Sequence, residues 1–304
     1  MGEVSSIRRI IICLDLSAMD NRLIQYLNAL LKTVKVNKLY FIHIRKAIDS
    51  VNIGLKEYQI EKKEFESNNE LIKAKIDDFI VNQLNNAAEI DWESIVIEGS
   101  PSIELLHWVN INKVDLLIIG RKDIKRGSGI TAGRLLRKSE CSVLFVPEKE
   151  ISSFKKVLIP VDFSASSDYT LKEAYQLANQ LYTEKITCQH IYFTAPTLNL
   201  RLNRTPSQFR AIVESNLNAS FKDLFKRNSI PEENIKISLI EDIDNRPASS
   251  ILKYAKKQGI ELIMMGPKGQ SQHKTNHIGS VTESLLTYNY TIPLLVIKQP
   301  SQKK

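Results

Sequence analysis

Short apolar runs recur along the chain in two matching series. The run at 9–14 ends in Asp15, and the run at 156–161 ends in Asp162; in both, one apolar residue and a serine follow. Runs that are apolar throughout are typical of strands buried on both faces of a parallel sheet. The pattern therefore predicts that each half of the chain opens with a buried strand.

An amphipathic helix is predicted after each of these strands. In the second copy it covers 167–182, and one face carries Leu171, Ala174, Leu177, Ala178 and Leu181. Two long charged segments, at 56–86 and 207–228, are also expected to be helical.

The remaining apolar runs pair in the same way and predict four further strands in each copy. Those with clear limits are 38–44 with 185–191, 114–120 with 260–266, and 142–147 with 293–297. The third strand of each copy leads to Gly99 or Asn245. Asparagine tolerates positive φ best among the non-glycine residues, so both positions are expected to have positive φ. Pro101 and Pro247 then suit the first turn of a helix.

Each copy thus reads β-α-β-α-β-α-β-α-β. This alternation predicts an α/β fold of two tandem Rossmann-like domains, each a five-stranded parallel sheet with helices on both faces. We expect domains at 1–150 and 151–304, with the boundary within 148–154. Such sheets bind ligands in the crevice beyond the carboxyl ends of their strands.

Composition narrows the function classes. The 304 residues are 43% hydrophobic and carry a formal charge of +8. Lys and Arg are spread along the predicted helices, no five of them are consecutive, and aromatic residues do not alternate with them. We therefore expect no nucleic-acid partner, but a basic, solvated surface that could favour anionic ligands.

Cysteine usage and the first residues bear on location. Cys13, Cys141 and Cys188 are far apart in sequence and form no CxxC pair, which favours a reducing compartment. The apolar run before Asp15 is too short for a signal peptide or a membrane span. A cytoplasmic protein without a membrane partner is expected.

A glycine loop follows the fourth strand of the second copy. Gly266, Gly269, Gly279 and Ser280 form the spacing G-x2-G-x9-G-S. Glycines leave room for phosphate oxygens to reach backbone N–H groups, and the start of the next helix favours an anion. Ser280 could also cap that helix, with Glu283 completing a capping box, and this alternative needs no ligand.

The first copy departs from this loop. No glycine stands three residues after Gly120, and the stretch to Gly129 is four residues shorter than its counterpart. Ile130 stands where the second copy has serine, and four basic residues crowd the loop: Arg121, Lys122, Lys125 and Arg126. They could still attract an anion, but the backbone cradle is lost.

These residues resemble the universal stress protein family, in particular its tandem two-domain members, over essentially the whole chain. The fold implied is that of the adenine nucleotide alpha hydrolase-like group, and the glycine spacing marks the ATP-binding subgroup. By this resemblance, Asp162 meets adenosine and the backbone at Ile191 contacts adenine. In the first copy Asp15 and Ile44 match, but Cys13 replaces proline.

The resemblance implies a ligand set in the second copy, in which the glycines, Ser280 and Val281 hold ribose and phosphates and Thr282 adjoins them. The full expected set is Pro160, Val161, Asp162, Ile191, Met265, Gly266, Lys268, Gly269, Gly279, Ser280, Val281 and Thr282.

Several of these residues have plainer interpretations. Asp162 could serve only as a carboxylate at a helix N-terminus. Met265 is most simply strand core, and Lys268 and Lys274 could be either phosphate ligands or solubilising residues.

The histidines are expected to be structural rather than catalytic. His43 and His190 each stand near the end of a predicted strand, where we expect them to be partly buried. His273 and His277 lie four apart in a polar loop, but no third ligand is evident, so no metal site is expected.

Three functions remain open. The first is a stress-response regulator that binds ATP in its second domain, with Mg²⁺ on the phosphates and a protein partner of unknown identity. The second is a scaffold that binds no nucleotide, in which the domains pair as an intrachain pseudo-dimer through strands 142–146 and 293–298, with a homodimer possible. The third is an enzyme that transfers AMP or hydrolyses ATP slowly. No GxxxxGK[ST] loop occurs, and no general base is identified.

Overall fold

The computed structural model describes residues 7–45, 55–122, 129–148, 153–194, 205–269, 278–289 and 291–299, without the side chains of 55–67 and 129–131. The chain divides between Ser152 and Ser153 into two compact units, which we call the first and second domains.

Both domains alternate strands and helices as the apolar runs predict. The elements of the first domain are β1 (Arg9–Leu14), α1 (Met19–Leu31), β2 (Lys38–Arg45), α2 (Leu55–Gln83), β3 (Trp92–Glu98), α3 (Pro101–Asn112), β4 (Leu116–Arg121), α4 (Gly129–Lys138) and β5 (Ser142–Pro147). Those of the second domain are β6 (Lys156–Pro160), α5 (Ala165–Gln180), β7 (Lys185–Tyr192), α7 (Pro206–Arg227), β8 (Ile235–Glu241), α8 (Pro247–Gln258), β9 (Leu262–Met265), α9 (Ser280–Tyr288) and β10 (Leu294–Val296). Short 3₁₀ turns at Ala87–Glu89 and Glu232–Asn234 precede β3 and β8.

The strands form the same five-stranded order in each domain. It is β3-β2-β1-β4-β5 in the first and β8-β7-β6-β9-β10 in the second, and every pairing within a domain is parallel. The connections run in one direction from the first strand and then reverse, so β1 and β6 stand at the point where the strand order changes. Ligand crevices of open α/β sheets lie at this point, beyond the carboxyl ends of the strands.

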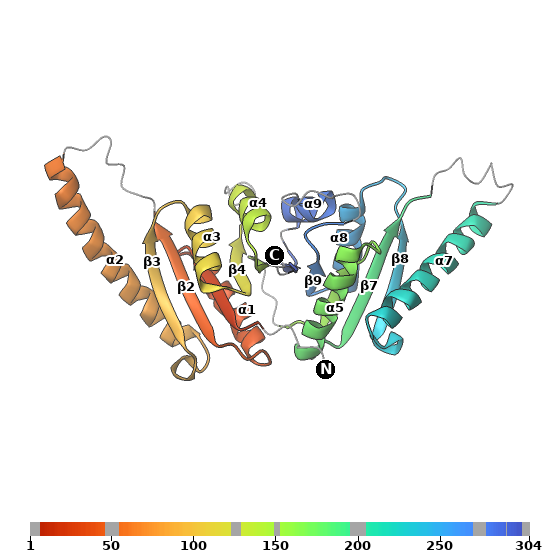
Figure 1. Cartoon of the computed structure of the whole chain (residues 1–304), viewed down its shortest axis with the longest axis horizontal. Helices are drawn as coiled ribbons and strands as arrows, with labels where there is room; N and C mark the ends of the chain where they lie inside the picture. Colours follow the sequence, from red (N-terminus) through yellow and green to blue (C-terminus); the bar gives the residue numbers. More distant parts are fainter. Residues whose placement is uncertain are drawn as a thin grey trace. The chain divides into compact units, whose positions relative to one another are not determined.

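Helices lie on both sides of each sheet (Figure 1). Because parallel crossovers are right-handed, the reversal of direction sends the first two helices of a domain to one face and the last two to the other. The last two are in contact with each other in both domains, α3 with α4 and α8 with α9. The predicted class, two tandem Rossmann-like domains, is confirmed.

The core forms where the apolar runs predict it. Three consecutive residues of β1, Ile10 to Ile12, are fully buried, as expected for a central parallel strand. On α5, four of the five residues predicted for the inner face are buried. The fifth, Leu181, is half-buried because α5 ends at Gln180 and Leu181 is already the C-cap.

The turns that precede α3 and α8 also agree with the sequence pattern. Gly99 has a φ of 147° and Asn245 a φ of 52°, so both positions have the predicted positive φ. Pro101 and Pro247 are the first residues of their helices, where a missing backbone N–H costs nothing.

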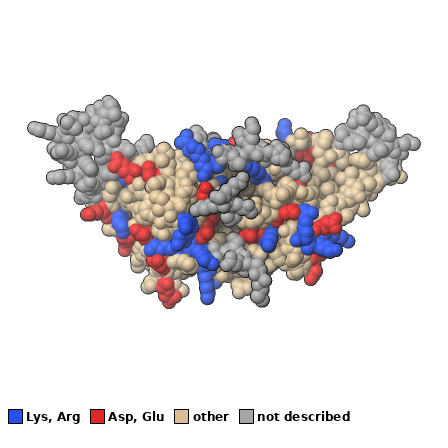
Figure 2. Space-filling model, in the orientation of Figure 1, with Lys and Arg blue, Asp and Glu red and all other residues tan. Residues whose placement is uncertain are grey.

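Basic and acidic side chains are interspersed over the face of the molecule shown in Figure 2. Within the described ranges, no helix combines the length and apolarity needed to cross a membrane.

Candidate functional site

The residues of the ligand set that the resemblance implies for the second copy surround one cavity of about 520 Å³, which we call the motif cavity. It lies at the carboxyl ends of β6, β7 and β9, beside the first turn of α9. All twelve predicted residues line it: Pro160, Val161, Asp162, Ile191, Met265, Gly266, Lys268, Gly269, Gly279, Ser280, Val281 and Thr282. Its size and its place in the sheet are typical of small-molecule sites.

A tight turn after β6 orients the Asp162 carboxylate. Phe163 has a φ of 60°, a left-handed conformation that is costly for a bulky residue and that the sequence did not reveal. Oδ1 of Asp162 accepts hydrogen bonds from the backbone N and the Oγ of Ser164, at 3.1 and 2.7 Å. The backbone N of Asp162 donates to Oγ of Ser167 at 3.0 Å, and the side chain of Ser164 caps α5. These bonds fix the position of the carboxylate at the cavity wall.

The loop after β9 packs so closely that two positions need glycine. A Cβ on Gly269 would overlap Oδ2 of Asp162, and a Cβ on Gly266 would lie 2.7 Å from Oγ1 of Thr170. The glycine backbone therefore reaches the Asp162 turn directly. A larger residue would push the loop out and change the shape of the cavity.

The start of α9 differs from the predicted capping box. The N-cap is Gly279 and Ser280 is the first residue of the helix, so no side chain caps α9 and the prediction that Ser280 and Glu283 form the box is wrong. The physical reason is the loop closure: the Gly279 backbone N donates to the Pro267 carbonyl at 2.8 Å, which sets the cap one residue earlier. The Ser280 side chain is consequently exposed at the cavity edge.

A buried hydroxyl ties the first turn of α9 to the loop. Oγ1 of Thr282 donates to the backbone carbonyl of Gly266 at 3.0 Å. The first turn of a helix leaves backbone N–H groups without intrahelical partners, and its positive dipole end favours anions. This end of the motif cavity is therefore suited to negative charge.

The histidines at the ends of β2 and β7 make the structural contacts expected of them. Nδ1 of His190 lies 2.8 Å from the Val161 carbonyl, and Nδ1 of His43 lies 3.0 Å from the Leu14 carbonyl. Because a carbonyl only accepts, each Nδ1 carries the proton. Burial lowers the pKa of His190, which favours the neutral ring. Its ring also packs against Phe163, with centroids 4.7 Å apart.

Six residues outside the expected ligand set also line the motif cavity: Ser167, Gln189, His190, Asn245, Pro247 and Ile251. Gln189 carried only a weak signal in the sequence, because its run also contains Lys185, Thr187 and His190. Ser167 and Ile251 carried none, since only the packing of α5 and α8 brings them to the strand ends.

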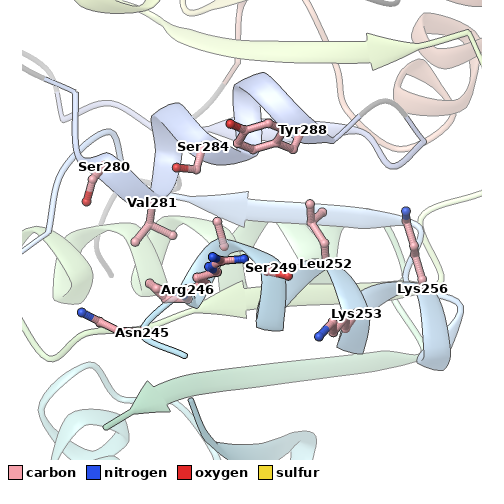
Figure 3. A pocket seen from close by; sticks show the side chains of 12 residues that line it. Asn245, Arg246, Ser249, Leu252, Lys253, Lys256, Ser280, Val281, Ser284 and Tyr288 are labelled. Atoms are coloured by element: carbon pink, nitrogen blue, oxygen red, sulfur yellow. The ribbon is translucent and has the colours of Figure 1, made fainter. Parts of the chain in front are cut away.

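A second hollow of about 620 Å³ adjoins the motif cavity between α8 and α9. Figure 3 shows its side chains, with Lys253 and Lys256 on α8 and Tyr288 on α9. The two hollows share four lining residues: Asn245, Pro247, Ser280 and Val281. The edge where they meet thus lies beside the first turn of α9.

No group of three metal-ligating side chains is found in the described part of the chain. His273, His277 and Lys274 lie outside the described residues, so the predictions made for them stay predictions. Lys268 lines the motif cavity and is half-buried there.

The corresponding cavity of the first domain is smaller, about 270 Å³, and more apolar. The chain aligns without a gap from Asp15–Ile44 to Asp162–Ile191. Met19 therefore replaces Ser166, and its Cγ lies 2.5 Å from where a Cβ on Gly120 would stand. Methionine fills irregular gaps, and here it fills space beside the strand ends.

The charges at the first cavity are already paired within the protein. Lys122 forms an ion pair with Asp15, which also accepts a hydrogen bond from Oγ of Ser17 at 2.5 Å. Burial alone would raise the pKa of Asp15, but these contacts with Lys122 and Ser17 hold it below its usual value. An incoming anion would have to compete with Asp15 for the Lys122 ammonium.

The fold and the site define a doubly wound α/β protein with a glycine-lined crevice at the strand ends of one of its two domains. The sequence profile of the universal stress protein family matches residues 6–147 and again 153–298. The chain therefore belongs to the universal stress protein family and carries two of its domains in tandem.

Known relatives agree with this assignment. Universal stress protein MJ0577 of Methanocaldococcus jannaschii is 27% identical over 165 residues, which cover 48% of this chain and 96% of that protein. Universal stress protein MJ0531 of the same organism is 26% identical over 150 residues, covering 49% and 85%. The crystal structure of a universal stress protein from Archaeoglobus fulgidus superposes with a TM-score of 0.65 at 17% identity, covering 98% of this chain and 99% of that one. At 17% identity, the similarity to the Archaeoglobus fulgidus structure shows a shared fold.

Proposed function

We propose that the second domain binds ATP in the motif cavity and that the protein acts as a nucleotide-dependent regulator. The observation that carries the proposal is the convergence of all twelve residues of the expected ligand set, distant in sequence, on one cavity of about 520 Å³. A capped helix after a glycine-rich loop would need no ligand, but α9 has no side-chain cap, so that alternative explanation of the motif loses its basis.

The donor set fits the parts of a nucleotide. The Asp162 carboxylate accepts hydrogen bonds and suits the hydroxyls of a ribose. The first turn of α9, with the Ser280 hydroxyl, suits the phosphates, and Lys268 adds a positive charge on the same side. Mg²⁺ would be held mainly through the phosphates, because the described residues offer no cluster of three protein ligands.

The first domain is proposed to serve as a scaffold that binds no nucleotide. Its cavity has about half the volume of the motif cavity, Met19 fills part of the space, and Asp15 is paired with Lys122. A cytoplasmic location and at most slow ATP hydrolysis are further parts of the proposal. The neutral His190 ring has its Nδ1 proton committed to Val161, which leaves no evident base at that nitrogen.

The test is isothermal titration calorimetry with ATP and Mg²⁺ on the wild type and on Gly279→Val. Gly279 has a φ of −65°, and a Cβ there would have its nearest neighbours at 3.4 Å or more, so the fold should accept a side chain. Valine would nevertheless place methyl groups at the phosphate end of the cavity. We expect ATP affinity to fall by about tenfold or more.

Gly279→Ala is the matched control because it adds a single methyl group at the same atom. It should lie between the wild type and Gly279→Val, and all three should melt at similar temperatures. Equal ATP affinity in wild type and Gly279→Val, or no binding by the wild type at millimolar ATP, would refute the proposal.

A further inference from the structure

Gln189 is a buried amide that finds no partner within the described protein. It lies on β7, is completely buried, and lines the motif cavity. Neither its Oε1 nor its Nε2 has a hydrogen-bond partner among the described residues. Buried amides are almost always hydrogen-bonded, because an unpaired one loses its contacts with water and gains nothing in return.

The direction of the Gln189 side chain follows from its neighbours on the strand. The His190 ring packs on Phe163, which packs on Phe221 of α7, so His190 faces the side of the sheet covered by α7. Consecutive residues of a strand point to opposite faces. Gln189 therefore faces the other side with Ile191, where α8 and α9 contribute Ile251 and Val281 to the cavity.

The first domain offers an internal comparison. The gapless alignment of the two copies places Ile42 at the position of Gln189. Ile42 is buried and apolar, as expected of a central strand, and it lines the smaller cavity. The sheet itself thus has no need of an amide at this position. Of these two positions, the one that carries an amide belongs to the domain with the larger cavity.

The chemistry of an amide limits what could satisfy it. It presents a carbonyl acceptor and an N–H donor side by side in one plane. A 6-aminopurine offers the complementary pair, an exocyclic amino group beside an acceptor ring nitrogen, and glutamine reads adenine through this pair in other settings. The position beside Ile191 is where the base of a nucleotide would lie if its phosphates reach α9.

We propose that the Gln189 side chain recognises the base of the ligand, by pairing with the amino group and adjacent ring nitrogen of a 6-aminopurine. The inference rests on the proposed function, since it assigns a specificity-determining residue to the same cavity. Gln189 would determine which base is bound, whereas Asp162 and the glycine loop would hold the ribose and the phosphates.

The experiment compares ATP with purine riboside 5′-triphosphate, which lacks only the 6-amino group, by calorimetry. The wild type should bind ATP about tenfold more tightly, because the analogue leaves one amide atom of Gln189 unpaired. Gln189→Met, which has a similar volume and no amide, should bind both triphosphates within about twofold of each other, through a loss of affinity for ATP.

Gln176→Met is the matched control. Gln176 lies on α5, its Oε1 is also buried without a described partner, and it does not line the motif cavity. This variant should keep the wild-type preference for ATP.

The outcomes separate the two proposals. If the wild type binds ATP but does not distinguish it from the analogue, or if Gln189→Met keeps the tenfold preference, the role of Gln189 is wrong and ATP binding stands. If the wild type binds neither triphosphate, both proposals fall. The wild-type comparison needs no variant, so it can refute the role of Gln189 even if Gln189→Met does not fold.

Discussion

Asp20 and Ser167 occupy the same position in the two copies and make the same contact in different ways. In the second domain the Ser167 hydroxyl accepts a hydrogen bond from the Asp162 backbone N. In the first, the Asp20 carboxylate accepts from the backbone N of Asp15 at 3.0 Å and of Leu16 at 2.8 Å. Burial raises the pKa of Asp20 to about 6. The first domain therefore has a titrating carboxyl group at the position where the second domain has the neutral hydroxyl of Ser167.

This difference predicts a pH effect on the stability of the first domain. Because the pKa of Asp20 is higher in the folded chain than in the unfolded one, the folded state binds more protons between about pH 4 and 6. The contribution of Asp20 to stability is therefore fully present below that window and is lost as the pH rises through it. The free energy of unfolding of the wild type, compared with that of Asp20→Ser, should fall by on the order of 2 kcal/mol between pH 4 and pH 7.

Urea unfolding of the wild type and of Asp20→Ser across this pH range measures the difference in their free energies of unfolding. Asp15, whose pKa is lowered, makes the opposite contribution, but it is present in both proteins and should largely cancel from the difference. Ser167→Ala is the control in the second domain, because it removes the corresponding hydrogen bond but no titrating group. Its destabilisation should be independent of pH. A constant difference between wild type and Asp20→Ser would show that Asp20 does not titrate in this window.

At the scale of elements, the starts of α5 and α9 differ although each has a serine near its first turn. Ser164 is the N-cap of α5, and its Oγ accepts from the backbone N of Ser167 at 3.2 Å. Ser280 is already inside α9 and caps nothing. One serine therefore stabilises its helix, and the other leaves its hydroxyl available at the motif cavity.

Alanine substitution should separate these roles. Ser164→Ala should destabilise the second domain by about 1 kcal/mol, the usual cost of losing a side-chain cap. Ser280→Ala should change stability by less than about 0.5 kcal/mol, but weaken ATP binding through the lost hydroxyl. Thermal unfolding measures the stability of each variant, and calorimetry on the same samples measures its affinity for ATP. A stability loss at Ser280 similar to that at Ser164 would restore the capping-box interpretation.

At the scale of the whole molecule, the two domains share a fold and differ at the strand ends. The same strand order and the same Asp turn occur twice, yet only the second copy combines the glycine loop with the larger cavity. The pairing of the domains through their terminal strands and the association of two chains stay predictions.

The unequal copies predict one nucleotide per chain. Calorimetry should give a stoichiometry near one, Asp162→Asn should weaken binding, and the matched variant Asp15→Asn should leave it unchanged. The reason is that Asp15 is already paired with Lys122, beside a cavity of about half the volume. A stoichiometry of two, or a loss of affinity in Asp15→Asn, would contradict the division of roles between the domains.

Much of this architecture follows from local pattern. Fully apolar runs predicted the buried parallel strands, because a strand covered on both faces has no polar side. The positive φ at Asn245 followed from comparison of the two copies, because glycine stands at the matching turn of the first copy and asparagine tolerates positive φ. The glycine spacing singled out Gly266, Gly269, Gly279 and Ser280, and the family resemblance supplied the remainder of the twelve residues. They converge on the motif cavity because residues at the carboxyl ends of parallel strands share one edge of the sheet.

Only the tertiary structure decided which polar groups have hydrogen-bond partners and how the space around each side chain is filled. The cap of α9 fell on Gly279 because the loop closes onto Pro267, a contact that no local pattern reports. Met19 occupies part of the space at the first cavity, and Gln189 has no hydrogen-bond partner among the described residues, because packing from separate helices sets the space around each side chain. Periodicity in the sequence determines which face of an element is buried. The contacts made across that face depend on elements distant in the chain, and these contacts distinguish the two domains.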